Sequence, residues 1–131
     1  MSGLAEVLAG RALPGAYRWE SNRPVADVRH TVEHAGWRFG HLEGARIGNR
    51  AELHEAVAEA LVLPDWYGRN LDALADVLDD VDGRQLLLWD TWSVLARAEP
   101  AFFDQVVALL GGRVAVLLRG DGPDVGVPLL D

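Results

Sequence analysis

Gln85-Leu86-Leu87-Leu88-Trp89 is a nearly unbroken apolar run, and Val114-Ala115-Val116-Leu117-Leu118 is a second one. Short runs of this kind predict strands, and strands without a polar side are typical of sheets buried on both faces. Between them, Thr91–Arg97 predicts a short helix, and a longer helix is expected from Pro100 because apolar residues recur there at spacings of three and four. Two buried strands joined by helices indicate a parallel sheet.

The same alternation extends toward the N-terminus. Further strands are expected at Ala16–Trp19 and at Trp37–Leu42. Helices are expected from Pro24 to Ala35, after Asn49, and from Asn70 to about Asp79. The last helix follows a loop because Leu63-Pro64 stops the helix before it.

These elements predict an α/β domain of two or three layers. A small, mainly parallel sheet of three or four strands is covered by helices through right-handed crossovers. The 131 residues suit a single domain. Within it we expect an N-terminal extension at residues 1–36, a core at residues 37–119 and an irregular tail at residues 120–131. The extension begins with a short helix or arm up to about Pro14, and its strand is expected to lie parallel at a sheet edge.

Composition narrows the class of function. The net charge is −8, which disfavours binding to nucleic acid and favours encounter with basic proteins. The chain has no cysteine, so a disulfide framework and a thiol nucleophile are excluded. It shows neither a signal peptide nor an apolar run of membrane-spanning length, so we expect a cytoplasmic protein that is not membrane-bound.

The helix from Asn70 is the most informative segment. Its apolar side is predicted to carry Leu71, Leu74, Ala75 and Leu78. A second side carries a row of aspartates at positions 72, 76, 79 and 80. Like charges one turn apart repel, and only Arg69 lies close enough in sequence to relieve this repulsion. The row has two interpretations, a solvated helix face or a docking strip for Arg and Lys of a partner.

Two aromatic residues precede this helix, Trp66 and Tyr67. Aromatic rings beside carboxylates are typical of protein interfaces, which favours the docking interpretation. We expect one of the two rings to pack against the core and the other to face solvent.

The segment 63-LPDWYGRNLDALAD-76 resembles the barstar family of ribonuclease inhibitors. In that family a Leu-Pro, an aromatic pair, a glycine and Asn-Leu-Asp-Ala-Leu lead into an acidic helix. The similarity covers roughly residues 37–119, and it implies a barstar-like fold for this region. It also implies an intracellular inhibitor, not an enzyme, that blocks a basic secreted ribonuclease or related toxin as a 1:1 complex of a monomer. No cofactor is implied.

The resemblance assigns roles to individual residues. Trp66 matches a contact aromatic, Gly68 and Asn70 match the turn that presents the helix, and Asp72 and Asp76 match the two principal carboxylates. The residues expected to bind the partner are Trp66, Tyr67, Gly68, Asn70, Asp72, Ala75, Asp76 and Asp80. Carboxylates suit a nuclease cleft because they form charge-assisted hydrogen bonds with cations placed for phosphates.

Three positions depart from the family pattern. Ala75 stands where the family has a contact tryptophan, and Asp80 replaces a glycine. An acidic contact of the last helix falls near Gln105 or Val106, with Asp104 as the nearest carboxylate. These departures favour a different nuclease or toxin, and they leave open a second function as a binding module for a basic partner that is not a nuclease.

A third hypothesis comes from His30-Thr31-Val32-Glu33-His34, which matches the inverted zinc-protease pattern. Such a site needs a further metal ligand, and the alternative is the wet side of an amphipathic helix. His41 and His54 are isolated in the sequence and are expected to be packed or surface residues.

Overall fold

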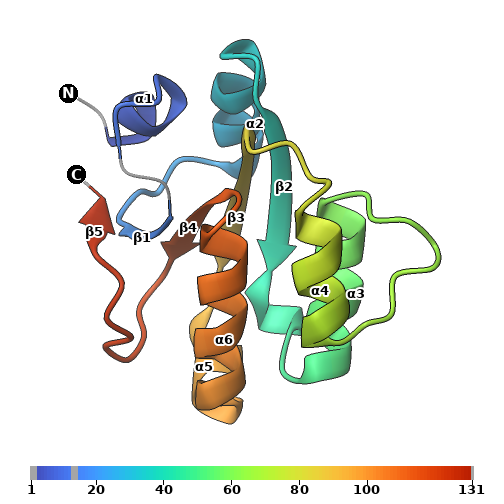
Figure 1. The fold of residues 1–131 in the computed structure, drawn as a ribbon. Helices are drawn as coiled ribbons and strands as arrows, with labels where there is room; N and C mark the ends of the chain where they lie inside the picture. Colours follow the sequence, from blue (N-terminus) through green and yellow to red (C-terminus); the bar gives the residue numbers. More distant parts are fainter. Residues whose placement is uncertain (1–2, 13–14, 131) are drawn as a thin grey trace.

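The structure is a computed structural model that describes residues 3–12 and 15–130 (Figure 1). The predicted alternation of strands and helices is present in it. In chain order the elements are α1 (Gly3–Leu8), β1 (Ala16–Trp19), α2 (Val25–His34), β2 (Arg38–Glu43), the 3-10 turn η1 (Gly44–Arg46), α3 (Arg50–Ala60), α4 (Leu71–Leu78), β3 (Gln85–Asp90), α5 (Ser93–Ala98), α6 (Pro100–Gly111), β4 (Ala115–Arg119) and β5 (Leu129–Leu130). Pro14, where the expected arm ends, and Asp131 of the tail lie outside the described residues.

The sheet has five strands in the order β2-β3-β4-β1-β5, and every neighbouring pair is parallel. The predicted parallel sheet is confirmed, but the predicted three or four strands are wrong. The tail is not wholly irregular, because Leu129 and Leu130 pair with Arg18 and Trp19 of β1. A strand of two residues is too short to show an alternating pattern in the sequence.

The N-terminal extension supplies an inner strand of this sheet. β1 lies between β4 and β5, so its predicted place at the edge is wrong. The Arg18 N–H donates to the Pro128 carbonyl at 2.8 Å, which ties the tail to the far side of β1. The tail strand thus covers what would otherwise be the exposed edge of β1.

Alternating residues of the strands form two separate cores. On β3, Leu87 and Trp89 enter the first core, and Leu86 and Leu88 enter the second. Helices α3 to α6 cover the first core, and α1 and α2 cover the second. In Figure 1, α4 and α6 lie in front of the sheet. The domain therefore has three layers, and α4 belongs to the outer layer over the first core.

Candidate functional site: the acidic helix and its loop

Helix α4 is fixed by its apolar face. Leu74, Val77 and Leu78 are buried in the first core, whereas Leu71 and Ala75 are half-buried. Val77 is an anchor that the predicted stripe did not include. Burying a leucine such as Leu74, which is 0% exposed, stabilises the fold by about 1.5–3 kcal/mol. The core therefore holds the backbone of α4 independently of any partner.

The turn before α4 is fixed by its own hydrogen bonds. The Asn70 side chain caps the helix, since its Oδ1 accepts a hydrogen bond from the Ala73 N–H at 2.8 Å. The residue in the left-handed conformation is Arg69, with φ of 54°, and not Gly68. Glycine is favoured at position 68 because a Cβ there would lie 3.2 Å from the Ala73 Cβ. Both predicted turn residues thus position the helix start.

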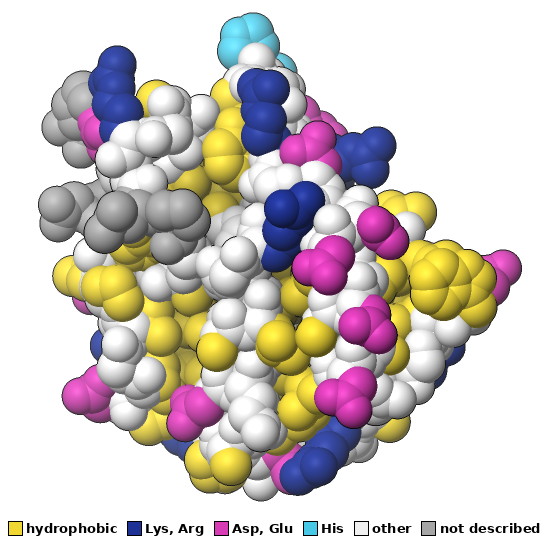
Figure 2. Space-filling view, in the orientation of Figure 1, with side chains coloured by type: hydrophobic (Ala, Val, Ile, Leu, Met, Phe, Trp, Pro, Cys, Tyr) yellow, Lys and Arg dark blue, Asp and Glu magenta, His cyan; other side chains and the backbone are white. Residues whose placement is uncertain are grey.

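The opposite face of α4 carries the predicted aspartate row. Asp72, Asp76, Asp79 and Asp80 are all exposed. None of these carboxylates forms an ion pair or accepts a hydrogen bond from the part of the chain that the structure describes. Figure 2 shows acidic side chains following one another over the position of α4. The row is therefore solvent-facing and not neutralised by the described residues.

Arg69 does not relieve the row, although its position in the sequence allowed this. Its guanidinium pairs with Glu55 of α3 and donates to the Tyr67 carbonyl at 3.0 Å. The hydrogen bond and the charge of Glu55 raise the pKa of Arg69. The nearest cation in the sequence thus fixes the loop and leaves the aspartates unpaired.

The aromatic pair divides as expected, one ring inside and one outside. Tyr67 is 3% exposed and packs in the first core, whereas Trp66 is 76% exposed. The Tyr67 ring is enclosed by the core and leaves little side-chain surface for the partner contact that the sequence analysis assigns to it. Trp66 is the ring that is available to a partner.

The buried end of Tyr67 meets a buried histidine. The Tyr67 hydroxyl lies 2.5 Å from His54 Nδ1. Burial raises the pKa of Tyr67 to about 12, although the charge of Arg69 acts in the opposite direction. Burial, with a smaller effect of Arg69, lowers the pKa of His54. His54 is therefore a buried histidine that helps to hold Tyr67, and with it the loop before α4, against the core.

We call residues 62–69 the aromatic loop. Its two ends, Val62 and Arg69, both adopt left-handed backbone conformations, with φ of 55° and 54°. Such conformations cost a non-glycine residue on the order of 1–3 kcal/mol and persist where the surroundings enforce them. Here Tyr67 in the core and Arg69 on Glu55 provide that enforcement. Trp66 is thus held on a preformed loop.

The departures from the family pattern also have definite positions. Ala75 is half-buried and offers no large side chain to a partner. Val106 is 0% exposed, which excludes it as a surface contact. Gln105 is exposed, and Asp104 borders a hollow that it shares with Phe103 and Pro123.

The polar cluster that the sequence interpretation missed lies across three strands. Asp90 at the end of β3 accepts hydrogen bonds from Arg119 Nε at 2.6 Å and Arg119 Nη2 at 3.0 Å, and it contacts His41 Nε2 at 2.8 Å. Burial raises the pKa of Asp90, but hydrogen bonds and charges of Arg119 and His41 outweigh this effect and lower it. The sequence does carry a signal for this cluster, since Asp90 and Arg119 directly follow the two apolar runs. The carboxyl ends of parallel strands meet at one edge of a sheet, so these two side chains can be expected to lie close together.

The histidine pair of the zinc-protease pattern lies on the solvated side of α2. The rings of His30 and His34 stack with centroids 6.0 Å apart, and both residues and Glu33 are exposed. Over residues 3–12 and 15–130, no group of three or more His, Asp or Glu side chains is placed to hold a metal ion. Among the described residues, the motif has no further ligand of the kind that the hypothesis requires.

None of the helices in the described residues has both the length and the apolar character needed to cross a membrane. Fold and surface together define the class: a parallel α/β protein that presents an acidic helix beside an exposed tryptophan.

The family follows from a comparison with known families. Residues 37–123, more than half of the chain, match the family described as Barstar (barnase inhibitor). The chain therefore belongs to the barstar family, which is described by its barnase inhibitor. The match begins at residue 37, as the resemblance implied, and it leaves the segment with α1, β1 and α2 as an N-terminal extension.

The fold also resembles that of a chain in a solved structure. A chain in "Structure of Drosophila ORC bound to DNA" superposes with a TM-score of 0.61 at 17% sequence identity. The alignment covers 84% of this chain but only 33% of the Drosophila chain. At this identity the similarity concerns the fold alone.

Proposed function

We propose that this protein inhibits a basic ribonuclease by inserting α4 and the aromatic loop into the active site of the enzyme. The observation that carries the proposal is the pair Asp72 and Asp76, which lie one helical turn apart, exposed and without an internal cation among the described residues. Membership of the barstar family supports the class of target.

The proposed mechanism is mimicry of the substrate backbone. A ribonuclease cleft holds several cations close together for phosphate groups. Asp72 and Asp76 meet these cations with charge-assisted hydrogen bonds, and Asp80 extends the negative surface beyond the end of α4. The net charge of −8 accelerates encounter with a basic enzyme, a form of steering for which barnase and its inhibitor are the reference system.

Trp66 supplies the apolar part of the proposed interface. Its ring is exposed while the loop that carries it is held by Tyr67 and Arg69. Because the loop is already ordered, binding loses little conformational entropy in this loop. With Ala75 in place of a contact tryptophan, Trp66 becomes the principal aromatic anchor of the surface.

The proposed setting is the interior of the cell that makes the nuclease, with a monomer forming a 1:1 complex. Membership of the barstar family supports this setting, in which the partner is a secreted enzyme whose activity is blocked before export. Because Ala75 and Asp80 depart from the family pattern, we expect the target nuclease to differ from the nucleases that other barstar proteins inhibit.

The test is a pull-down of the purified protein against the secreted proteins of its own cell, followed by an RNA-cleavage assay with the captured protein. Replacing Asp76 by Ala should weaken inhibition by at least about 2 kcal/mol, which is roughly 30-fold in affinity. A loss of about this size is the usual definition of an interface hot spot, for which an aspartate of barstar is a standard example. The matched control is Asp27→Ala, an exposed aspartate on α2, which covers the other face of the sheet from α4.

Two outcomes would reject the proposal in different ways. If Asp72→Ala and Asp76→Ala both inhibit RNA cleavage as well as the unmodified protein, the acidic-helix mechanism is wrong. If the protein captures a basic partner through α4 but protects no RNA, it is a binding module with a barstar fold and a target other than a nuclease.

A further inference from the structure

The first strand of the sheet, β2, has an open side. It stands at one end of the sheet, and within residues 3–12 and 15–130 its only strand neighbour is β3. The Arg38 N–H donates to the Arg84 carbonyl at 3.0 Å, on the β3 side. Because backbone groups alternate between the two sides of a parallel strand, those of Phe39, His41 and Glu43 point away from β3. Their amides donate to no acceptor among the described residues.

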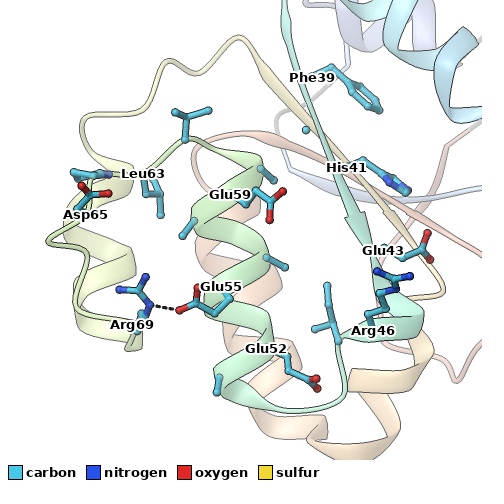
Figure 3. Close-up of a pocket in the computed structure, with 18 of the residues that line it drawn as sticks. Phe39, His41, Glu43, Arg46, Glu52, Glu55, Glu59, Leu63, Asp65 and Arg69 are labelled. Atoms are coloured by element: carbon cyan, nitrogen blue, oxygen red, sulfur yellow. Dashed lines mark hydrogen bonds and ion pairs between the residues drawn. The ribbon is translucent and has the colours of Figure 1, made fainter.

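A hollow of about 990 Å³ is lined by residues of β2, α3 and the aromatic loop, and we call its part along the open side of β2 the β2 groove. Figure 3 shows this groove between β2 and α3, with Glu59 and Glu52 of α3 beside it, whereas Leu63 and Asp65 of the aromatic loop lie on the other side of α3. α3 packs closely over β2, since a Cβ on Gly40 would lie 2.8 Å from the Ala60 carbonyl oxygen. Small residues such as Ala56 line its α3 side, which leaves room for another chain.

The shape of the groove matches an extended peptide. β2 has six residues, and a strand rises about 3.3 Å per residue, so the open side is roughly 20 Å long. Exposed strand edges are normally covered or shortened because they attract other strands. The open side of β2 is not short, no strand formed by the described residues covers it, and α3 packs over one face of it.

The charge of the groove favours a basic occupant. On the β2 side of α3 its lining contains three carboxylates, Glu43, Glu52 and Glu59, against Arg29 and Arg46. These three carboxylates form no ion pair with the described residues. Of the two cations, Arg29 stacks over the Phe39 ring at 4.8 Å and lies on the far side of the strand from α3.

We propose that the β2 groove binds an extended basic peptide segment, which joins the sheet as an added strand beside β2. The outward backbone groups of Phe39, His41 and Glu43 form the ladder, a recognised mode of peptide binding. Lys or Arg side chains of the peptide face α3 and meet Glu59, and the alanines of α3 leave room for their stems. The alternate side chains are small and apolar and lie on the other face of the sheet. This site is separate from the aspartate row of α4, and the proposal does not depend on nuclease inhibition.

The test uses the uniformly ¹⁵N-labelled protein and the acetylated, amidated peptide Lys-Val-Lys-Val-Lys-Val. Added-strand binding should slow the amide hydrogen exchange of Phe39, His41 and Glu43. The Gly40 and Leu42 amides, which face β3, should change little because the sheet already protects them. A peptide of the sequence Glu-Val-Glu-Val-Glu-Val should not bind, since it repeats the shape with the opposite charge.

Charge variants locate the site. Glu59→Lys should weaken the peptide affinity by about fivefold or more, because it places a cation where the peptide is basic. Asp104→Lys, the same change of charge on an exposed site outside the groove, should leave the affinity within about twofold. The double variant Asp72→Asn and Asp76→Asn should also bind the peptide as the unmodified protein does.

The proposal is overturned if the basic peptide fails to bind at millimolar concentration, or if it binds without slowing exchange at His41 and Glu43. It is equally overturned if the affected amides lie on α4, since this would identify the aspartate row as the peptide site. Loss of nuclease inhibition in the Asp72 and Asp76 variant bears only on the function proposed for α4.

Discussion

Asp76 and Asp90 are both aspartates on ordered elements, yet they have opposite surroundings. Asp90 is 18% exposed and is held by Arg119 and His41, whereas Asp76 is exposed on α4 and pairs with no described residue. The same fold therefore neutralises one carboxylate and leaves a row of others facing solvent. A paired carboxylate stabilises the molecule that carries it. An unpaired row that repels itself adds nothing to the fold, so its use is expected to lie outside the molecule.

The largest predicted effect concerns the paired carboxylate. Asp90→Ala should reduce the free energy of unfolding by about 3 kcal/mol, because it leaves Arg119 and His41 without their shared partner. Urea denaturation followed by tryptophan fluorescence measures this change. The Asp90→Asn variant keeps the shape and one acceptor, and it should lose less. A loss below about 1 kcal/mol for Asp90→Ala would remove the contrast with α4.

Acid should act on the same residue. The pKa of Asp90 is lowered in the folded state, so its contribution to stability is present above the ordinary value of 3.8. It is lost as the pH falls through that value toward the lowered pKa, because the unfolded chain then binds a proton that the folded chain does not. The unmodified protein should therefore lose more stability between pH 5 and pH 3 than Asp90→Asn does. Equal losses in urea titrations at the two pH values would contradict this.

A smaller effect is predicted for the support of the aromatic loop. Tyr67→Phe should cost about 1–2 kcal/mol of stability, because the buried His54 Nδ1 loses its hydrogen-bond partner. Trp66→Ala should change stability by no more than about 0.5 kcal/mol, because the ring is exposed. Thermal unfolding of the two variants compares a ring that supports the fold with a ring that is available to a partner. If Trp66→Ala proved the more destabilising, the assignment of the two rings would be reversed.

The sequence carried the main features of this arrangement but not all of them. The apolar runs at Gln85 and Val114 predicted the parallel sheet, and Asn70 predicted the start of α4, because these signals are local. The choice between Trp66 and Tyr67 as the exposed ring depended on His54, thirteen positions earlier in the chain. The Asp90 cluster joins residues from three strands. β5 could not be predicted because its two residues are too few to show the alternation of apolar and polar side chains that marks a strand. In each case the missing information was a contact between residues that are distant in the sequence and meet only in the folded chain.

The smallest effect on stability is predicted for neutralising the aspartate row of α4. The double variant Asp72→Asn and Asp76→Asn keeps the size of both side chains and removes one repulsive pair, which is worth a few tenths of a kcal/mol in a helix. Asp72 lies in the first turn, where its charge is favourable to the helix dipole, so part of that gain is offset. The net change in unfolding free energy should therefore stay within about 0.5 kcal/mol of zero, measured by urea denaturation at low salt. A clear loss of stability would mean that the carboxylates contribute to the fold after all, and the row would lose its distinction from Asp90. Unchanged stability combined with loss of inhibition would assign the row to a partner, because the change would then act only on the complex.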